Sequence, residues 1–262
     1  MKLNIVPARN GLQWVKLGVQ TFFRQPLALT GLFFLYIAAG ALLSVLPVVG
    51  PVLALAIVPA ATLGLMAATQ EVVKGRFPMP TVLVSAFRAG RQQLRAMILL
   101  GGLYAAGCLA VMALAQLLVE VPRSAQEGTA ATMMTPQYQL SMLVAMLLYL
   151  PISLMFWHAP ALVHWHGVTP IKSLFFSTVA CLRNWRALTM FGLAWLGFLM
   201  AGSVVVVMLA LATGNPGVAG AALMPVALLF TAMFSTSIYF TFRDSFVASG
   251  EASDDGNAQE LT

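Results

Sequence analysis

The chain has 262 residues, of which 60% are hydrophobic and only 8% are charged, and its formal net charge is +6. Soluble domains are usually about 45–50% apolar and about 25% charged. The composition therefore excludes an ordinary soluble enzyme and predicts a polytopic membrane protein. Cys108 is expected inside a membrane span and Cys181 in a helix on the cytoplasmic side, so we expect no disulfide.

Six long apolar runs are predicted to cross the membrane, because a spanning helix needs about 20 apolar residues. They cover residues 27–46, 51–70, 96–119, 139–163, 187–213 and 219–242. The segments 48–50 and 214–217 are predicted to be tight turns, and 120–138 a longer outer loop. The predicted fold class is an all-α bundle of six transmembrane helices in three hairpins, each preceded by an interfacial amphipathic helix.

The basic residues predict the orientation of these spans. Of the 14 Lys and Arg residues, all but Arg123 fall on the same side of the six spans. Because loops rich in Lys and Arg stay in the cytoplasm, both termini are expected to be cytoplasmic. Residues 1–242 are predicted to form a single transmembrane domain. Residues 243–262 contain five acids and are predicted to be a disordered cytoplasmic tail.

The chain contains a threefold repeat of one pre-span segment followed by one hairpin. The repeats cover about residues 7–73, 75–166 and 168–242, and their junctions align at 24–28, 92–96 and 183–187. Internal repeats are typical of membrane transporters. They also arise in passive bundles that grew by duplication, so the repeat leaves both interpretations open.

The pre-span segments are predicted to be amphipathic helices with cations on one face. In the first segment the predicted apolar face consists of Leu12, Val15, Val19 and Phe22. Such helices lie in the headgroup plane and attract anionic lipids. The candidate residues for contact with lipid or a partner are Lys16, Arg24, Arg88, Arg91, Arg95, Lys172, Arg183 and Arg186. The alternative is that these helices only anchor the spans, with Trp14, Trp165 and Trp185 as interfacial belt residues.

Few residues could carry chemistry within the membrane. No span has Asp, Glu, Lys or Arg near its middle, which argues against an ion-coupled transporter. The spacing of His158, His164 and His166 does not suit a metal site, and no nucleophile or phosphate-binding motif is present. We therefore expect no enzymatic activity and no cofactor. The candidate cavity-lining residues are His158, Thr231 and Ser235, and Pro151 and Pro160 are expected to kink the fourth span.

Three stretches resemble a known family. They are residues 1–18 (MKLNIVPARNGLQWVKLG), 22–29 (FFRQPLAL) and 75–91 (GRFPMPTVLVSAFRAGR). They resemble uncharacterised multi-pass inner-membrane proteins of beta-proteobacteria. The repeated junction pattern more distantly resembles YciC-type membrane proteins and the membrane domain of some glycerophosphodiester phosphodiesterases. The resemblance implies location in the bacterial inner membrane and supplies no catalytic residues.

These observations favour a non-enzymatic protein of the inner membrane. It is expected to act through anionic lipid headgroups of the cytoplasmic leaflet or through a membrane-protein partner, and not through nucleic acid. The alternative is a transporter or channel for a small or lipidic molecule.

Overall fold

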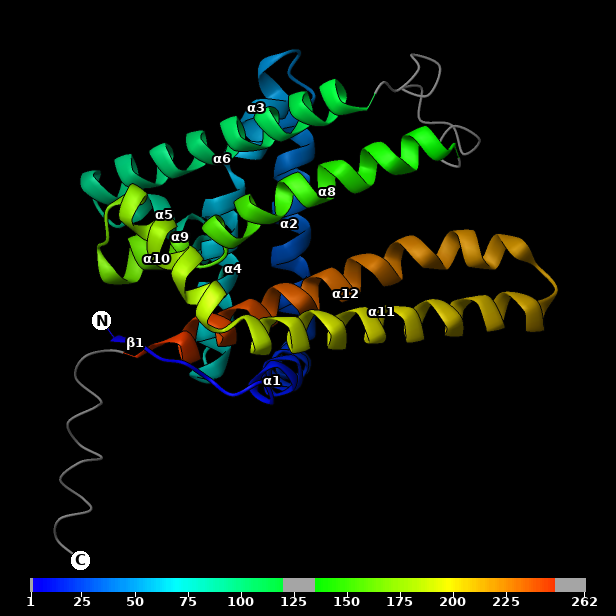
Figure 1. Cartoon of the computed structure of the whole chain (residues 1–262). Helices are drawn as coiled ribbons and strands as arrows, with labels where there is room; N and C mark the ends of the chain where they lie inside the picture. The colour runs from blue at the N-terminus through cyan, green and yellow to red at the C-terminus, as the bar shows by residue number, and fades with distance from the viewer. Residues whose placement is uncertain (1, 120–134, 248–262) are drawn as a thin grey trace, which may run out of the picture. The chain divides into compact units, whose positions relative to one another are not determined.

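The computed structural model describes residues 2–119 and 135–247. Within these ranges the regular secondary structure is helical apart from one pair of two-residue strands (Figure 1). The all-α fold class is therefore confirmed. Most of the predicted outer loop (120–134) and of the predicted tail (248–262) lies outside the described residues.

Six helical segments of the described chain are long and apolar enough to cross a membrane. They are Pro26–Ser44, Val49–Val73, Arg91–Leu118, Pro136–His166, Trp185–Thr213 and Gly220–Ser245. Each overlaps one of the predicted spans, which confirms a polytopic helical protein.

The chain forms two compact units, which we describe separately. The first unit comprises Met1–Ala38, Ala61–Arg88 and Val179–Thr262, and the second comprises Ala39–Ala60 and Ala89–Thr178. Three helices contribute residues to both units: α2 (Pro26–Ser44), α4 (Val58–Val73) and α10 (Pro170–Arg183).

The first unit is built on a hairpin of α11 (Trp185–Thr213) and α12 (Pro216–Ser245), against which α1 (Asn10–Arg24) packs (Figure 1). Gly214 ends α11 in the left-handed conformation that favours glycine (φ +61°). The Asn215 side chain then accepts a hydrogen bond from Gly217 N (2.9 Å) and caps α12. The predicted tight turn is thereby confirmed.

α1 packs through a face that contains its two glycines, and Phe22 is the one residue of the predicted apolar face that is fully buried there. Its buried residues are Gly11, Trp14, Gly18, Thr21 and Phe22. A Cβ at Gly11 would collide with the Ala187 carbonyl oxygen, and one at Gly18 with the Ser237 side chain. Leu12, at the start of the predicted apolar face, is 49% exposed and takes no part in this packing. The belt assignment of Trp14 is wrong, because this side chain is fully buried.

Asn184 joins the beginning and the end of the first unit. Its Oδ1 accepts from Val6 N (2.9 Å), and its Nδ2 donates to Asn4 O (3.0 Å) and Ser245 Oγ (3.3 Å). Next to it, β1 (Lys2–Leu3) pairs antiparallel with β2 (Phe246–Val247). Residues 243–247 therefore belong to α12 and β2, which corrects the predicted start of the disordered tail.

In the second unit α6 (Arg91–Leu118) is the central helix. It packs against α3 (Val49–Ala56), α8 (Pro136–Phe156) and α9 (Ala159–His166). A Cβ at Gly101 would collide with the Ala56 carbonyl oxygen, so glycine sets the close approach of α6 to α3. The phenol oxygens of Tyr104 and Tyr149 lie 2.7 Å apart and join α6 to α8 by a hydrogen bond. Polar pairs of this kind stabilise helix contacts inside a membrane.

Two of the spans are interrupted. The second is broken at Ile57 between α3 and α4, and the fourth at Trp157 and His158 between α8 and α9. Pro59 and Pro160 lie two residues after these breaks. Proline has no N–H to donate to the carbonyl four residues earlier, so it favours an interruption of the helix just before it. The expected kink at Pro160 is thus found as a break. Pro151 lies inside an uninterrupted α8, and the break before Pro59 was not predicted.

The pre-span segments differ more than their sequences suggest. The first forms α1 and the third forms α10, as predicted. The second forms only the 3₁₀ turn η1 (Pro80–Val84) and the one-turn α5 (Ser85–Arg88). Gly90 (φ +106°) then reverses the backbone, so Arg91 and Arg95 belong to α6 itself. Both cysteines are buried and neither forms a disulfide, Cys108 in α6 and Cys181 in α10.

Candidate functional site

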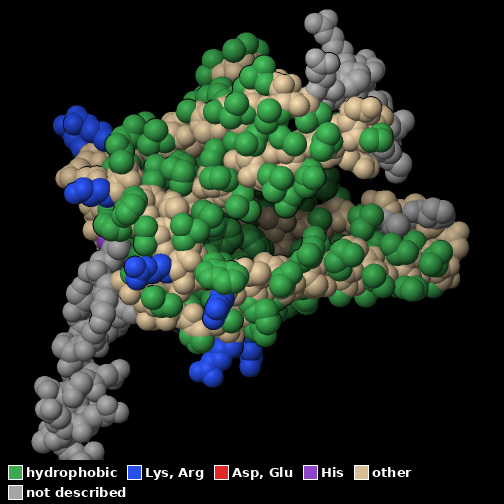
Figure 2. Space-filling model, in the orientation of Figure 1, with side chains coloured by type: hydrophobic (Ala, Val, Ile, Leu, Met, Phe, Trp, Pro, Cys, Tyr) green, Lys and Arg blue, Asp and Glu red, His purple; other side chains and the backbone are tan. Residues whose placement is uncertain are grey.

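The cations predicted to contact lipid or a partner are all exposed, and they lie in α1 or at helix ends. The first unit contains Lys16, Arg24, Arg88, Arg183 and Arg186, and the second contains Arg91, Arg95 and Lys172. Hydrophobic side chains cover the visible far part of the α11–α12 hairpin, without Lys or Arg (Figure 2). Charge is thus confined to the end of this hairpin where α11 begins and α12 ends.

The described residues contain two acids, and each already has a cationic partner. Glu71 accepts two hydrogen bonds from Arg76, both 2.6 Å long. Asp244 accepts from Arg243 Nε through Oδ1 (2.8 Å) and from Trp14 Nε1 through Oδ2 (2.8 Å). The described part of the second unit contains no Asp or Glu at all. Its three cations therefore have no carboxylate partner within it.

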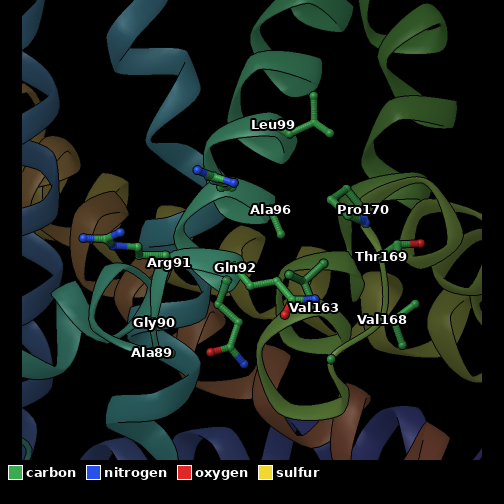
Figure 3. Close-up of a pocket in the computed structure, with 13 residues that line it drawn as sticks. Ala89, Gly90, Arg91, Gln92, Ala96, Leu99, Val163, Val168, Thr169 and Pro170 are labelled. Carbon is green, nitrogen blue, oxygen red and sulfur yellow. The ribbon is translucent and has the colours of Figure 1, made fainter.

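Two of these cations, Arg91 and Arg95, line a pocket of about 600 Å³ in the second unit. One wall is the beginning of α6 with Ala96 and Leu99, and the other is Val163 with the turn 167–170 (Figure 3). The pocket lies where the third span begins and the fourth span ends. It combines an apolar interior with a basic rim, which suits a ligand that has both an anionic and an apolar part.

The sequence places the two walls through glycine turns and one side-chain hydrogen bond. Gly90 directly precedes α6 and has no side chain that could cap the amides of the first turn. The positive end of the helix dipole therefore lies uncapped at the pocket. Gly167 (φ +63°) ends α9 and turns the chain toward Pro170. Gln93 Nε2 donates to the carbonyl oxygen of His164 (3.3 Å) and ties α6 to α9.

The break in the fourth span is held by a residue of α10. Ser177 Oγ accepts from His158 N (3.0 Å) and donates to Leu154 O (2.8 Å). These two backbone groups would bond each other in a continuous helix. The serine hydroxyl therefore bridges the interrupted hydrogen-bond ladder, and it fixes the start of α9 and hence the Val163 wall of the pocket.

The predicted cavity-lining residues are not brought together in one unit. His158 is buried in the second unit, and Thr231 and Ser235 lie in the first. Thr231 and Ser235 donate to backbone carbonyls of their own helix, Ala227 O and Thr231 O, each at 2.8 Å. Thr231 lines a mostly apolar groove of about 370 Å³ between α11 and α12. The hydroxyl that joins these two helices belongs instead to Ser237, which accepts from Trp195 Nε1 (3.2 Å).

Sequence reasoning identified the arginines of the pocket but missed the residues that shape it. Gly167 followed by Pro170 was a readable helix-end signal. Gln93 and Ser177 carried no such signal, because their partners are set by tertiary packing. Among residues 2–119 and 135–247, no group of three His, Cys, Asp or Glu side chains could hold a metal ion.

Comparison with known proteins gives one informative relative. No protein-family model matches the chain, and no solved structure matches it. The chain is 36% identical over 254 residues to a probable inner membrane protein of Burkholderia thailandensis, and the match covers 94% of each chain. Such an identity over nearly the full length of both proteins reaches all six apolar helices. The chain therefore belongs to the same family of inner-membrane proteins as this Burkholderia relative.

Proposed function

We propose that the protein is a non-enzymatic inner-membrane protein whose exposed cations face the cytoplasm and bind anionic lipid, alone or together with a membrane-protein partner. The observation that carries this proposal is the distribution of charge. Both described acids are paired with arginines, and the eight candidate cations are exposed. Anionic headgroups are the counter-ions that a membrane offers to such cations.

In the first unit, α1 carries two of these exposed cations. Its buried face packs on α11 and α12, so Lys16 and Arg24 stay exposed together with the apolar Leu12 and Phe23. A helix that exposes both cations and large apolar side chains lies favourably at the boundary between headgroups and acyl chains. Arg186 lies over the exposed Trp185 ring at 5.5 Å, a second such combination at the start of α11.

The proposal is tested with purified protein reconstituted into phosphatidylcholine vesicles that contain increasing fractions of phosphatidylglycerol. The unfolding temperature should rise with the anionic fraction, because ligands of the folded state stabilise it. High salt should weaken this effect by screening. In a variant with Lys16, Arg24, Arg183 and Arg186 all changed to Gln, the rise should be smaller. An unfolding temperature independent of phosphatidylglycerol would overturn the proposal.

The YciC-type relationship remains a proposal of ours. It rests on the three junctions at 24–28, 92–96 and 183–187. It is in keeping with a polytopic helical membrane protein.

A transporter for a small or lipidic molecule is the second candidate, favoured by the two interrupted spans. Both breaks precede a Pro-Ala pair, Pro59-Ala60 in the first repeat and Pro160-Ala161 in the second. Transporters often build substrate sites from discontinuous helices. The test is to place a cysteine at Ile57 and label it with a charged, water-soluble thiol reagent, with Leu109→Cys as the exposed apolar control. Labelling at Ile57 alone would support a water-filled path, and labelling at neither position would contradict it.

A further inference from the structure

The pocket at the beginning of α6 has the features of a site for one particular kind of ligand. We propose that it binds a single anionic phospholipid, with the phosphate at Arg91 and Arg95 and the first part of an acyl chain along Ala96 and Leu99. This inference rests on the proposed function and deepens it, because it assigns one defined lipid site within a general preference for anionic lipid.

The charge of the pocket favours an anion that carries several acceptor oxygens. Arg91 and Arg95 are four residues apart, so they lie on the same side of α6. Arginine offers donors in a fork that matches phosphate geometry. The uncapped first turn of the 28-residue α6 opens on the same rim, and its amides and dipole add to the attraction for a phosphate. No described carboxylate of this unit competes for the two guanidinium groups.

The size and the walls of the pocket indicate a phosphate attached to an apolar chain. Ligand sites for small molecules usually measure about 300–1,000 Å³, and the 600 Å³ here is far more than a bare phosphate fills. Besides the arginines the lining is mostly apolar, with Leu99, Val163 and Pro170, and its polar members are Gln92, Gln93 and Thr169. Leu99 is 50% exposed, so an acyl chain would cover apolar surface that no other described part of the unit covers.

The walls are fixed, and the arginines are free to adjust. Gln93 and Ser177 hold α9 in place through the hydrogen bonds to His164 O and His158 N. In Figure 3 the Arg91 guanidinium points away from the segment that contains Val168 and Pro170. Binding therefore requires this exposed side chain to rotate toward the rim, which long arginine side chains at a membrane surface do readily.

The experiment is native mass spectrometry of the purified full-length protein in detergent, with dioleoyl phosphatidylglycerol, dioleoyl phosphatidylethanolamine, glycerol 3-phosphate and inorganic phosphate as probes. We expect one phosphatidylglycerol to be retained in preference to phosphatidylethanolamine. The double variant Arg91→Gln/Arg95→Gln should weaken this binding by about tenfold or more. Arg9→Gln removes an exposed charge just before α1, outside the pocket and outside the eight candidate cations, and should leave the affinity within about twofold.

A pocket-filling variant keeps the test independent of charge. Ala96→Leu should reduce phosphatidylglycerol binding while leaving both arginines in place. If this variant does not fold, Leu99→Ala, which shortens the apolar wall, replaces it and should also weaken binding. Thermal unfolding in detergent checks that each variant is folded.

The outcomes separate the two proposals. If the double variant and Arg9→Gln bind phosphatidylglycerol equally, the pocket proposal is overturned although the general lipid preference stands. If wild type itself does not prefer phosphatidylglycerol, in detergent or in vesicles, the proposed function fails as well. If glycerol 3-phosphate or inorganic phosphate competes as strongly as the lipid, the site recognises free phosphate and the lipid assignment is overturned.

Discussion

The side-chain hydroxyl of Ser177 accepts a hydrogen bond from the backbone N–H of His158 at 3.0 Å. The same hydroxyl donates to Leu154 O at 2.8 Å, so it replaces the backbone bond that the break removes. A side chain inserted into the helical ladder is a recognised cause of a sharp kink. Here it satisfies two backbone groups of a segment that is long and apolar enough to cross a membrane.

We predict that Ser177→Ala destabilises the protein by about 1–3 kcal/mol, because it removes the hydrogen bonds to His158 N and Leu154 O that bridge the break. The control is Ser173→Ala, which is equally buried but loses only a hydrogen bond to Pro170 O in its own helix. Denaturant unfolding of both variants in detergent measures the difference. Equal stabilities for the two variants would mean that the bridge contributes nothing.

The glycine face of α1 gives a second prediction. Gly11→Ala and Gly18→Ala should each destabilise the packing of α1 by about 1–3 kcal/mol, since the added Cβ meets Ala187 O or Ser237. Gly31→Ala in α2 is the matched control, because its Cβ would meet nothing within 4 Å. It should be neutral or stabilise by up to about 1 kcal/mol through helix propensity. The melting temperatures of the three variants measure these effects. If Gly31→Ala lowers the melting temperature as much as Gly11→Ala, the packing argument is refuted.

Val48 provides a third prediction, from the turn between α2 and α3. It has φ +62° and ψ −54°, and Val49 N donates across it to Pro47 O (2.7 Å). A β-branched residue in this region of backbone space is strained by about 1–3 kcal/mol. Val48→Gly should therefore raise the free energy of unfolding by about 1 kcal/mol. Val49→Gly, one residue later at the start of α3, should lower it, and a loss of stability in both variants would contradict the assignment of strain.

Asn184 gives a fourth prediction, on local order. Asn184→Ala removes the hydrogen bonds to Asn4, Val6 and Ser245, so the pairing of β1 with β2 should open more often. Hydrogen exchange at residues 2–6 should accelerate by about tenfold or more. Asn215→Ala, which removes only the cap of α12, should leave exchange at residues 2–6 unchanged. Unaltered exchange in Asn184→Ala would show that the strands are held by other contacts.

The spans were predictable because hydropathy over about 20 residues decides membrane insertion largely without tertiary detail. The break at Ile57 was also within reach, since Pro59 marks it in the sequence. The stripe formed by Gly11, Trp14 and Gly18 was a readable signal that the larger apolar residues of α1 obscured. The contact of Ser177 with His158 was not predictable, because 19 residues and a turn separate partners that only the folded chain brings together.

The candidate site also has a part that the sequence predicted and a part that it did not. Arg91 and Arg95 were identified as candidate lipid-contacting residues from their positions in the sequence. This step needed no knowledge of the tertiary structure. The pocket itself depends on Gly90, Gly167 and the Gln93 hydrogen bond, which together set the distance between α6 and the turn before α10. Sequence alone therefore identified the two arginines as candidate lipid-contacting residues but not the concave surface beside them.

Lipid analysis of protein taken directly from its native membrane tests the central claim, that the exposed cations hold anionic lipid. Wild type and the variant with Lys16, Arg24, Arg183 and Arg186 changed to Gln are extracted with a disc-forming polymer, and a C-terminal reporter confirms the same topology for both. The account predicts more phosphatidylglycerol around wild type than in the bulk membrane, and less of this enrichment around the variant. The same lipid composition around wild type, around the variant and in the bulk membrane would contradict it.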